Sequence, residues 1–522
     1  MNKLLLAIDD VSLPFKKNVG LYLTKPTVRQ EPVLRPSPFG SGAPDDLAAY
    51  FYGTVLYDDG RYRMWYYAGH WEKNPDWPPE KMKQVAHAPW WFHGESSNFK
   101  TIGGPLCYAE SDDGINWIKP ALKQVLFKGS WDNNALDLPH TSVSAAIVIK
   151  DLEDPDPKRR YKMTYQFFVD QCEEIIEEYG TWNSVALAVS PDGINWTMIA
   201  IPYKDQFLEP SSFTKHNDMY IIHYHVMGET EGYRSEGGHA CGRTGVARVS
   251  PDFDCWPDVM VETFAPTEPE DPSKRGHDGT YDQVHLGVGA ASYGNVCVGL
   301  YGLWHNADFN NAFDEISGDL GLLVSNDGIH FREPVKGHRF IRREDSLATP
   351  VPGYDFHTIL CQANGILNVG DETRIYHGRW RNAGGHEDDV DLNQYASSEV
   401  ALATIPRDRW GAFGLNPDAT DGTVCSAPVT LPADCALSLN ADGITGLKVK
   451  LLDENFHSIS GYDNGSVTGS DGLGCPVEWL GKSLAELGGQ TVRFCVQMNR
   501  LGDDSPRLYA LNIIDESAAR SK

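Results

Sequence analysis

Apolar and polar residues alternate in short runs along most of this chain, and many of the runs end at glycine, asparagine or aspartate. Tyr52-Gly-Thr-Val-Leu-Tyr57 and Tyr62-Arg-Met-Trp-Tyr-Tyr67 form one such pair, separated by Asp58-Asp59-Gly60. Alternation that is rich in aromatic and β-branched residues is typical of half-buried strands, and the glycine allows a tight turn between them. Further pairs turn at 216–218, 293–295 and 369–371. The pattern predicts an all-β chain of antiparallel strands.

A second pattern, with a hydroxyl residue first and an aromatic residue last, returns five times at a roughly even period. Its copies are Ser111-Asp-Asp-Gly-Ile-Asn-Trp117, Ser190-Pro-Asp-Gly-Ile-Asn-Trp196, Ser250-Pro-Asp-Phe-Asp-Cys-Trp256, Ser325-Asn-Asp-Gly-Ile-His-Phe331 and a degenerate Thr404-Ile-Pro-Arg-Asp-Arg-Trp410. An Asp-Gly pair between extended runs is a hairpin signal, because glycine supplies the positive φ that the turn needs. A hairpin repeated in strand-rich sequence indicates a radial repeat architecture. Five copies predict a β-propeller of five blades, each with four strands.

The repeat ends after Trp410, which places a domain boundary there. Residues 1–412 are predicted to form the propeller and residues 413–522 a second, C-terminal domain. Short strands are expected in this second domain at 424–431, 436–439, 447–452, 477–480, 492–498 and 508–514. About a hundred residues with this pattern are typical of a β-sandwich.

The charge and composition of the chain limit the kinds of partner that it is expected to bind. The 522 residues carry a net charge of −27, which argues against nucleic acid or an anionic membrane as a partner, since both need a basic surface. The apolar run that opens the chain is too short for a signal peptide and ends at Asp9-Asp10, so it is expected to be an edge strand. The ten cysteines lack Cys-x-x-Cys spacing, and reduced core thiols in a cytoplasmic protein are expected. The oligomeric state is left open.

Five blades, a C-terminal sandwich and the run Tyr62-Arg-Met-Trp-Tyr resemble the five-bladed propeller glycoside hydrolases that include invertases, levanases and arabinanases. The repeated hairpin is similar to the Asp box of sialidases, which is structural and lies at the blade edge. The resemblance implies hydrolysis of a carbohydrate by acidic side chains on the innermost strands, with no cofactor. A pocket under a long aromatic loop favours exo-action on an oligosaccharide or polysaccharide.

The same resemblance indicates which acids are catalytic. Leu208-Glu209-Pro-Ser-Ser-Phe213 resembles the family's Arg-Asp-Pro-x-x-Phe run, which makes Glu209 a stabilising acid or proton donor. Glycoside hydrolysis needs a pair of carboxyl groups flanking the bond. Asp46 is expected to be the base or nucleophile, with Asp45 beside it as the alternative and as a substrate contact. Asp282 is expected to be the remaining acid/base, with Asp278 as its alternative and a substrate contact.

In a propeller, the loops that enter each innermost strand and those that join its second and third strands line one mouth. The joining loop 68–106 is unusually rich in indole groups, which stack on sugar rings. An alternative use of these side chains is a small core over the mouth. Predicted substrate contacts on these grounds are Trp71, Trp90 and Trp91, with Trp304, Arg379 and Arg381 on later strands.

Strand register brings three imidazoles and one carboxylate to comparable inner positions: His140, Glu209, His285 and His357. The histidines are expected to contact substrate hydroxyls. The alternative is a divalent metal site, because imidazole and carboxylate suit zinc, iron or manganese. A non-hydrolytic glycan-binding propeller, or a metal-dependent enzyme using this set, is therefore the second functional hypothesis.

Overall fold

The computed structural model describes residues 2–71, 99–100, 104–140, 142–168, 183–203, 208–227, 243–264, 283–305, 316–382, 395–502 and 505–519. Within these ranges the regular secondary structure is almost wholly strand, as the alternating pattern of the chain predicts. The short helical elements are η2 (Pro157–Arg159), η5 (Arg343–Asp345), η7 (Ile444–Gly446), η8 (Leu484–Leu487) and α3 (Glu516–Ala519). No helix in the described part of the chain has the length and apolarity that crossing a membrane requires.

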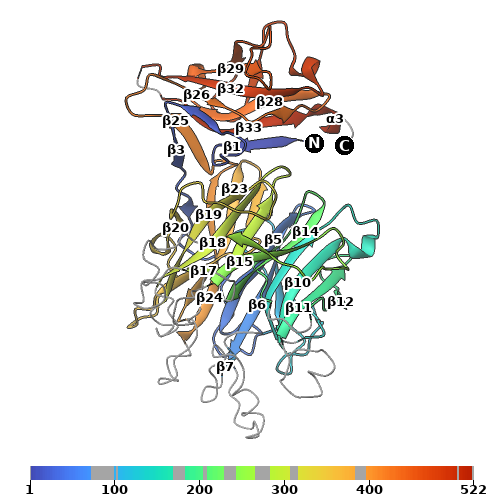
Figure 1. Cartoon of the computed structure of the whole chain (residues 1–522). Helices are drawn as coiled ribbons and strands as arrows, with labels where there is room; N and C mark the ends of the chain where they lie inside the picture. Colours follow the sequence, from blue (N-terminus) through green and yellow to red (C-terminus); the bar gives the residue numbers. More distant parts are fainter. Residues whose placement is uncertain are drawn as a thin grey trace, which may run out of the picture.

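Most strands belong to three four-stranded sheets and one nine-stranded sheet, which fill the lower part of Figure 1. The nine-stranded sheet is held together at its middle by a single parallel residue pair, Gly318 with Ile359, so we describe its two halves separately and the whole as five consecutive strand groups. The first group is β5 (Ala48–Asp58), β6 (Arg61–Trp71), β7 (Phe99–Lys100) and β8 (Leu106–Ser111), and the second is β9 (Ser142–Lys150), β10 (Tyr161–Phe168), β11 (Asn183–Ser190) and β12 (Thr197–Ala200). The third is β13 (Ser212–His216), β14 (Met219–Met227), β15 (Arg243–Ser250) and β16 (Val261–Phe264). The fourth is β17 (Gln283–Ser292), β18 (Cys297–His305), β19 (Ser317–Ser325) and β20 (Arg339–Ile341). The fifth is β21 (Thr358–Cys361), β22 (Ile366–Val369), β23 (Glu372–Arg381) and β24 (Ser397–Pro406), with β4 (Thr27–Val28) at its edge.

The repeated motif forms the hairpin that its sequence predicts. In the second group the Ser190 hydroxyl accepts the Gly193 N–H at 2.8 Å, and Asp192 accepts the N–H groups of Ile194 and Asn195 at 2.9 and 2.8 Å. Gly193 has φ +77°, which a side chain would disfavour. The hairpins at Gly114 and Gly328 repeat this arrangement. The turn is therefore fixed by bonds between residues that are two or three positions apart.

The backbone carbonyl of each of these three glycines also forms a hydrogen bond with a side chain from the preceding group. The Trp65 indole N–H donates to the Gly193 carbonyl at 2.9 Å, and His223 hydrogen-bonds with the Gly328 carbonyl at 2.9 Å. The Tyr376 hydroxyl of the fifth group donates to the Gly114 carbonyl of the first at 2.8 Å. This last bond joins the end of the series of groups to its beginning.

The innermost strands are β5, β9, β13, β17 and the β21–β22 pair. Strand β5 packs against β9 on one side and against β22 and β24 on the other, while β13 packs against β9 and β17. The ends at which these strands begin are called the mouth end below. At the opposite end, the turn after β17 meets the N-terminal strand, where Asn295 accepts the Leu4 N–H at 2.8 Å.

The remaining strands form one twelve-stranded sheet, drawn in the upper part of Figure 1. It combines β1 (Lys3–Leu6), β2 (Phe15–Lys17) and β3 (Val19–Leu23) with nine C-terminal strands. These are β25 (Gly411–Leu415), β26 (Asp421–Cys425), β27 (Val429–Thr430), β28 (Cys435–Asp442), β29 (Leu447–Leu452), β30 (Gly465–Val467), β31 (Gly472–Glu478), β32 (Thr491–Asn499) and β33 (Arg507–Asp515). The sequence boundary placed β1 to β3 with the propeller, whereas here they pair with β33, β26 and β25. We call residues 2–23 and 411–519 the C-terminal unit.

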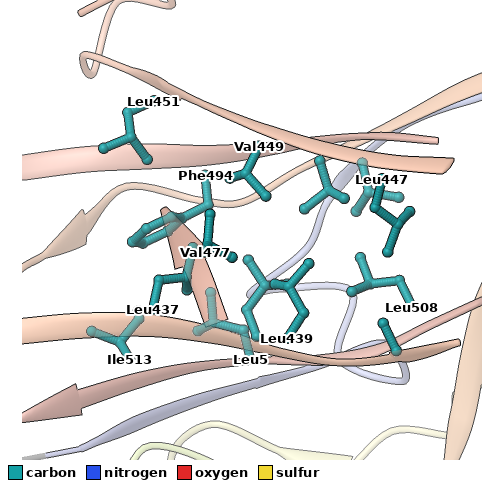
Figure 2. Packing of buried hydrophobic residues seen from close by; sticks show 14 of the residues in the cluster. Leu5, Leu437, Leu439, Leu447, Val449, Leu451, Val477, Phe494, Leu508 and Ile513 are labelled. Atoms are coloured by element: carbon teal, nitrogen blue, oxygen red, sulfur yellow. The ribbon is translucent and has the colours of Figure 1, made fainter. Parts of the chain in front are cut away.

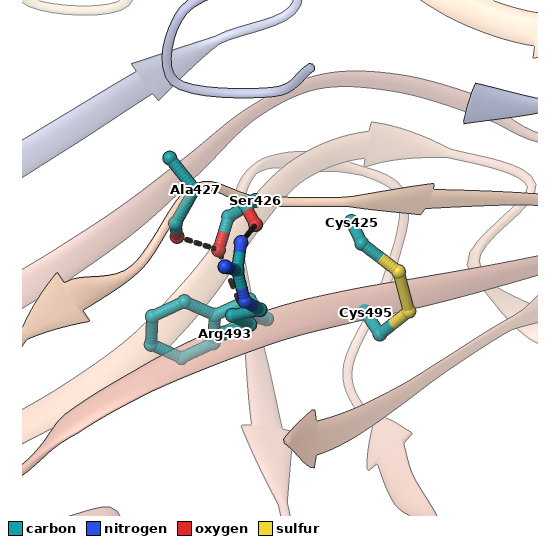
Figure 3. Close-up of a disulfide and its surroundings, with 6 residues drawn as sticks. Cys425, Ser426, Ala427, Arg493 and Cys495 are labelled. Carbon is teal, nitrogen blue, oxygen red and sulfur yellow. Dashed lines mark hydrogen bonds between the residues drawn. A yellow bond between two sulfur atoms is a disulfide. The ribbon is translucent and has the colours of Figure 1, made fainter. Parts of the chain in front are cut away.

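The core of the C-terminal unit is apolar. Figure 2 shows Leu447, Val449 and Phe494 on one layer of strands directed toward Leu5 and Leu439 on the other. The same unit contains a disulfide between Cys425 of β26 and Cys495 of β32, seventy residues apart (Figure 3). The expectation that the cysteines are all reduced is wrong for this pair. Cys107, Cys297 and Cys361 are buried free thiols, as expected.

Candidate functional site

Aromatic side chains from three of the strand groups meet at the mouth end. The cluster comprises Tyr50, Tyr52, Tyr67, Trp304, Cys361 and Trp380, with His285 packed against it. We call these seven residues the axial cluster. The alternation of β5 points Tyr50 and Tyr52 to the same face, and β18 and β23 end here with their tryptophans. All seven side chains are buried.

His285 is held in a fixed orientation within this cluster. Its Nδ1 lies 2.8 Å from the Tyr52 hydroxyl. Its ring stacks on Trp304 with centroids 3.6 Å apart, and Trp380 approaches Tyr52 edge-on at 5.3 Å. Offset and edge-to-face contacts of this kind add to the stabilisation from burial. The Tyr52–His285 pair is therefore a preorganised hydrogen-bonding unit between the first and fourth groups.

Glu209, half-buried just before β13, adds a carboxylate from the third group. Burial raises the pKa of Tyr52 and of Tyr67 well above the usual value, and the negative charge of Glu209 raises both further. The pKa of Cys361 is raised by burial and, in part, by the same carboxylate. Glu209 thus lies within electrostatic range of three protonated side chains of the axial cluster.

His140, which belongs to the second group, lies just before β9. Its ring stacks on Phe167 with centroids 4.0 Å apart, and its Nδ1 lies 3.0 Å from the Tyr165 hydroxyl. Burial lowers the pKa of His140 to about 4, so the imidazole is neutral at pH 7. A neutral imidazole can both donate and accept a hydrogen bond.

The proposed metal set is not gathered in one place. His357 is exposed, whereas His140 and His285 are buried. Across the residues that the structure describes, which include all four members of the set, no group of three or more His, Cys, Asp or Glu side chains could hold a metal ion. These four residues therefore do not form a metal-holding group in the described part of the chain, and the metal alternative has no support from their placement.

Asp45 and Asp46 are buried, and both have basic partners. Asp45 accepts from the Ser37 hydroxyl at 2.6 Å, from Tyr66 at 2.9 Å and from the Lys119 ammonium at 2.5 Å. Asp46 accepts the Gly42 N–H at 3.0 Å and lies 3.8 Å from the Lys128 ammonium. These donors satisfy the hydrogen-bonding capacity of the two buried carboxylates. Asp45 in particular holds the entry to β5 in place.

Arg379 and Arg381 hold backbone segments together. Arg379 is buried and donates to the carbonyls of Arg29 and Gln30, at 2.7 Å each, and to Ser346 at 2.8 Å. Arg381 donates to the Tyr395 carbonyl at 3.0 Å and to the Thr349 carbonyl. These guanidinium groups join the N-terminal segment and the loop before β21 to the fifth group, a structural task that the sequence did not indicate.

Several predicted residues lie outside what the structure describes: Asp278, Asp282, Trp90, Trp91 and the side chain of Trp71. Trp304 and His285, by contrast, are brought together. Sequence analysis missed Tyr52, Tyr67, Cys361 and Trp380. The alternation in Ala48–Asp58 was a signal for Tyr52, but the partners of that face lie on distant strands.

No family model matches the chain, and no curated protein matches it. Among solved structures it is similar to a glycosyl hydrolase from Bacteroides ovatus, with 14% identity over 75% of this chain and 95% of that chain and a TM-score of 0.43. It is also similar to a family 43 arabinoxylan arabinofuranohydrolase from Bacillus subtilis, in complex with cellotetraose (10% identity, 92% of this chain and 98% of that chain, TM-score 0.38). A third is a family 117 glycoside hydrolase from Zobellia galactanivorans (11% identity, 73% of this chain and 94% of that chain, TM-score 0.38). All three carry the name of the class that the sequence resembles, and likenesses this low carry no argument about activity.

Proposed function

We propose that the chain is a glycoside hydrolase whose site is the axial cluster together with Glu209, in a five-bladed propeller that carries a C-terminal β-sandwich. Five consecutive strand groups, closed by the Tyr376–Gly114 bond, support five blades. The observation that carries the function is the packed axial cluster at the mouth end, with Glu209 near enough for its charge to raise the pKa of Tyr52 and Tyr67. A carboxylate beside protonated donors and aromatic faces suits the recognition and protonation of a sugar.

In this proposal Glu209 is the acid that donates a proton to the leaving oxygen or stabilises the transition state. The partner carboxylate comes from Asp282, with Asp278 as its alternative, or from Asp46 as base or nucleophile. Tyr52, held by His285, donates a hydrogen bond to a substrate oxygen. His140 contacts a hydroxyl from the second group. Carboxylates suffice for this chemistry, so no cofactor is proposed.

The proposed substrate is a neutral oligosaccharide or polysaccharide, attacked from a chain end. The net charge of −27 disfavours a polyanionic substrate. Tyr354, Phe356 and Tyr395 form an aromatic platform at the entry to the fifth group, with the first two rings stacked at 5.5 Å. Tyr354 is 44% exposed, so its ring is accessible to a sugar beyond the axial cluster.

The test is turnover of a panel of aryl glycosides by the parental protein and by Glu209→Gln. The variant keeps the shape of the side chain and removes the acid, so kcat is expected to fall about 10²- to 10⁴-fold. Glu262→Gln, on the exposed face of β16 in the same group, is the matched control and is expected to retain the parental rate. Unchanged turnover in folded Glu209→Gln would sink the proposal.

One observation favours a non-hydrolytic glycan-binding propeller as the second candidate. Asp45 and Asp46 both have lysine partners, which makes each of them less suited to act as the base of a two-carboxylate mechanism. This candidate predicts saturable binding of an oligosaccharide, with no release of aryl alcohol from any panel member. A chelator is expected to stop a metal-dependent reaction and to leave the activity or binding of both candidates unchanged.

A further inference from the structure

A cavity of about 440 Å³ lies at the end of the strand groups opposite the mouth. One wall comes from the turns after β17 and β22 and from the hairpin after β24. The other wall comes from β1, β28, β31 and β33 of the C-terminal unit. The axial cluster lies at the far ends of the same strands, so this cavity is separate from the candidate site.

The charges around the cavity are balanced. Its basic residues are Lys3 and Arg407, and its acidic residues are Asp371 and Asp408. Arg407 lies 3.6 Å from Asp408, and Lys3 donates to the Thr430 carbonyl at 3.1 Å. Two charges of each sign favour neither an anion nor a cation as the occupant.

Neutral hydrogen-bonding groups make up most of the other polar lining: Asn2, Tyr293, Asn368, Ser438, Asn440 and Asn512. Asn368 and Asn440 are held rigid, because Asn368 donates to Asp408 at 2.6 Å and Asn440 donates to the Arg407 carbonyl at 2.8 Å. Leu4 and Leu473 add apolar surface. Amide and hydroxyl groups beside apolar patches are complementary to a sugar, which has hydroxyls at its edge and C–H groups on its faces.

Tyr293 lines the cavity and carries a buried hydroxyl group that has no hydrogen-bond partner among the residues that the structure describes. Burial raises its pKa well above the usual value, and the charge of Asp408 raises it further, so the phenol is a donor. A buried polar group without a partner costs stability, and a rotation of the Tyr293 side chain toward an acceptor oxygen in the cavity would remove that cost.

We propose that this cavity is a binding site for a neutral mono- or disaccharide, separate from the mouth. Its volume is within the range of small-molecule sites, roughly 300 to 1,000 Å³. Since the strand groups and the C-terminal unit each supply one wall, the bound sugar contacts both. Binding therefore stabilises their association and raises the temperature of unfolding.

Gly474 provides a way to close the cavity without strain. It lines the cavity, its φ is not in the left-handed region, and a Cβ added there meets nothing within 4 Å. Gly474→Phe therefore places a ring in the cavity. Gly472→Phe is the matched control, because Gly472 lies on the same strand with similar freedom and is not part of the lining.

The experiment measures binding of xylose, arabinose and cellobiose, with galacturonate as a charged comparison, by calorimetry and by the shift in Tm. At least one neutral sugar is expected to bind, with affinity reduced about tenfold or more in Gly474→Phe and unchanged in Gly472→Phe. Crystals soaked with that sugar are expected to show it beside Tyr293. Absence of neutral-sugar binding, binding that survives Gly474→Phe, or equally tight binding of galacturonate would overturn the proposal.

The two sites can be tested apart. Gly474→Phe is expected to cleave aryl glycosides at the parental rate, and Glu209→Gln is expected to retain sugar binding in the cavity. A parental protein that cleaves no glycoside would refute the proposed hydrolase while leaving the cavity result intact.

Discussion

The strand groups and the C-terminal unit are stabilised by different kinds of buried contact. The groups are linked by polar side chains that reach from one group to the next, as Trp65 does to Gly193, and they bury His140, His223 and His285. The C-terminal unit is held by a continuous apolar core and by a disulfide, and its one described histidine, His457, is exposed. Buried histidines therefore lie in the strand groups, whereas the described histidine of the C-terminal unit is exposed.

This difference between the two regions indicates where a functional site is expected. A buried imidazole or carboxylate costs stability unless it is paired, so its presence needs a structural or chemical reason. The axial cluster has a buried imidazole with Glu209 nearby, whereas the C-terminal unit has no buried imidazole among its described residues. The contrast can be tested by changes that affect one region and spare the other.

The largest expected effect on stability is in the apolar core. Phe494 is fully buried, and Phe494→Ala is expected to lower the free energy of unfolding of the C-terminal unit by about 3–5 kcal/mol through lost burial and a cavity. Chemical denaturation measures the loss. Glycosidase turnover per folded molecule is expected to stay near the parental value, and a large fall in kcat would show that the two regions are not functionally separate.

The next effect concerns the disulfide. Replacing Cys425 and Cys495 together by alanine is expected to cost about 2–4 kcal/mol, because the bond restrains the unfolded chain. Alkylation and mass spectrometry of freshly purified protein are expected to leave these two cysteines unlabelled until a reductant is added. Complete labelling without reductant would support the cytoplasmic location expected from the sequence, since thiols stay reduced there.

The repeated hairpins offer a smaller effect with an internal control. Asp192→Ala removes the acceptor of two backbone N–H groups and the Asn195 amide, and is expected to cost about 1–3 kcal/mol. In the third copy, Asp252 accepts the Asp254 N–H at 3.0 Å, so Asp252→Ala is expected to cost less. Equal losses in thermal unfolding would show that the repeat is not held by these bonds.

The smallest effect per residue is expected from mild acid, which acts on His223 and also on His140 and His377, because burial lowers the pKa of all three. Burial lowers the pKa of His223 from 6.5 to about 4, so the unfolded chain takes up a proton first as the pH falls. Stability contributed by the neutral imidazole is therefore complete above pH 6.5 and is lost below it, by about 1 kcal/mol down to pH 5.5. Denaturation curves at the two pH values should show this loss in the strand groups. An equal loss in the C-terminal unit, whose His457 is exposed, would break the comparison.

Local features were predictable from the sequence because their bonds are local. The hairpin at Gly193 depends on groups no more than three positions away, and the strand expected at 447–452 is β29. The placing of β1 beside β33 was not predictable, because an edge strand carries no sign of which sheet it joins. Register counting failed for His357, where a shift of a few residues moves a side chain from the axis to solvent.

The sequence by itself determined that the chain is all-β, that its hairpins recur, and that a different strand pattern follows Trp410. Only the tertiary structure decided that Tyr52 meets His285, 233 residues away, and that Asp45 accepts hydrogen bonds from Lys119 and Tyr66. Alternation and turn residues act between neighbours, whereas these contacts depend on how separate strand groups pack around one axis. That packing is set by the summed burial of many side chains, which no short stretch of sequence records.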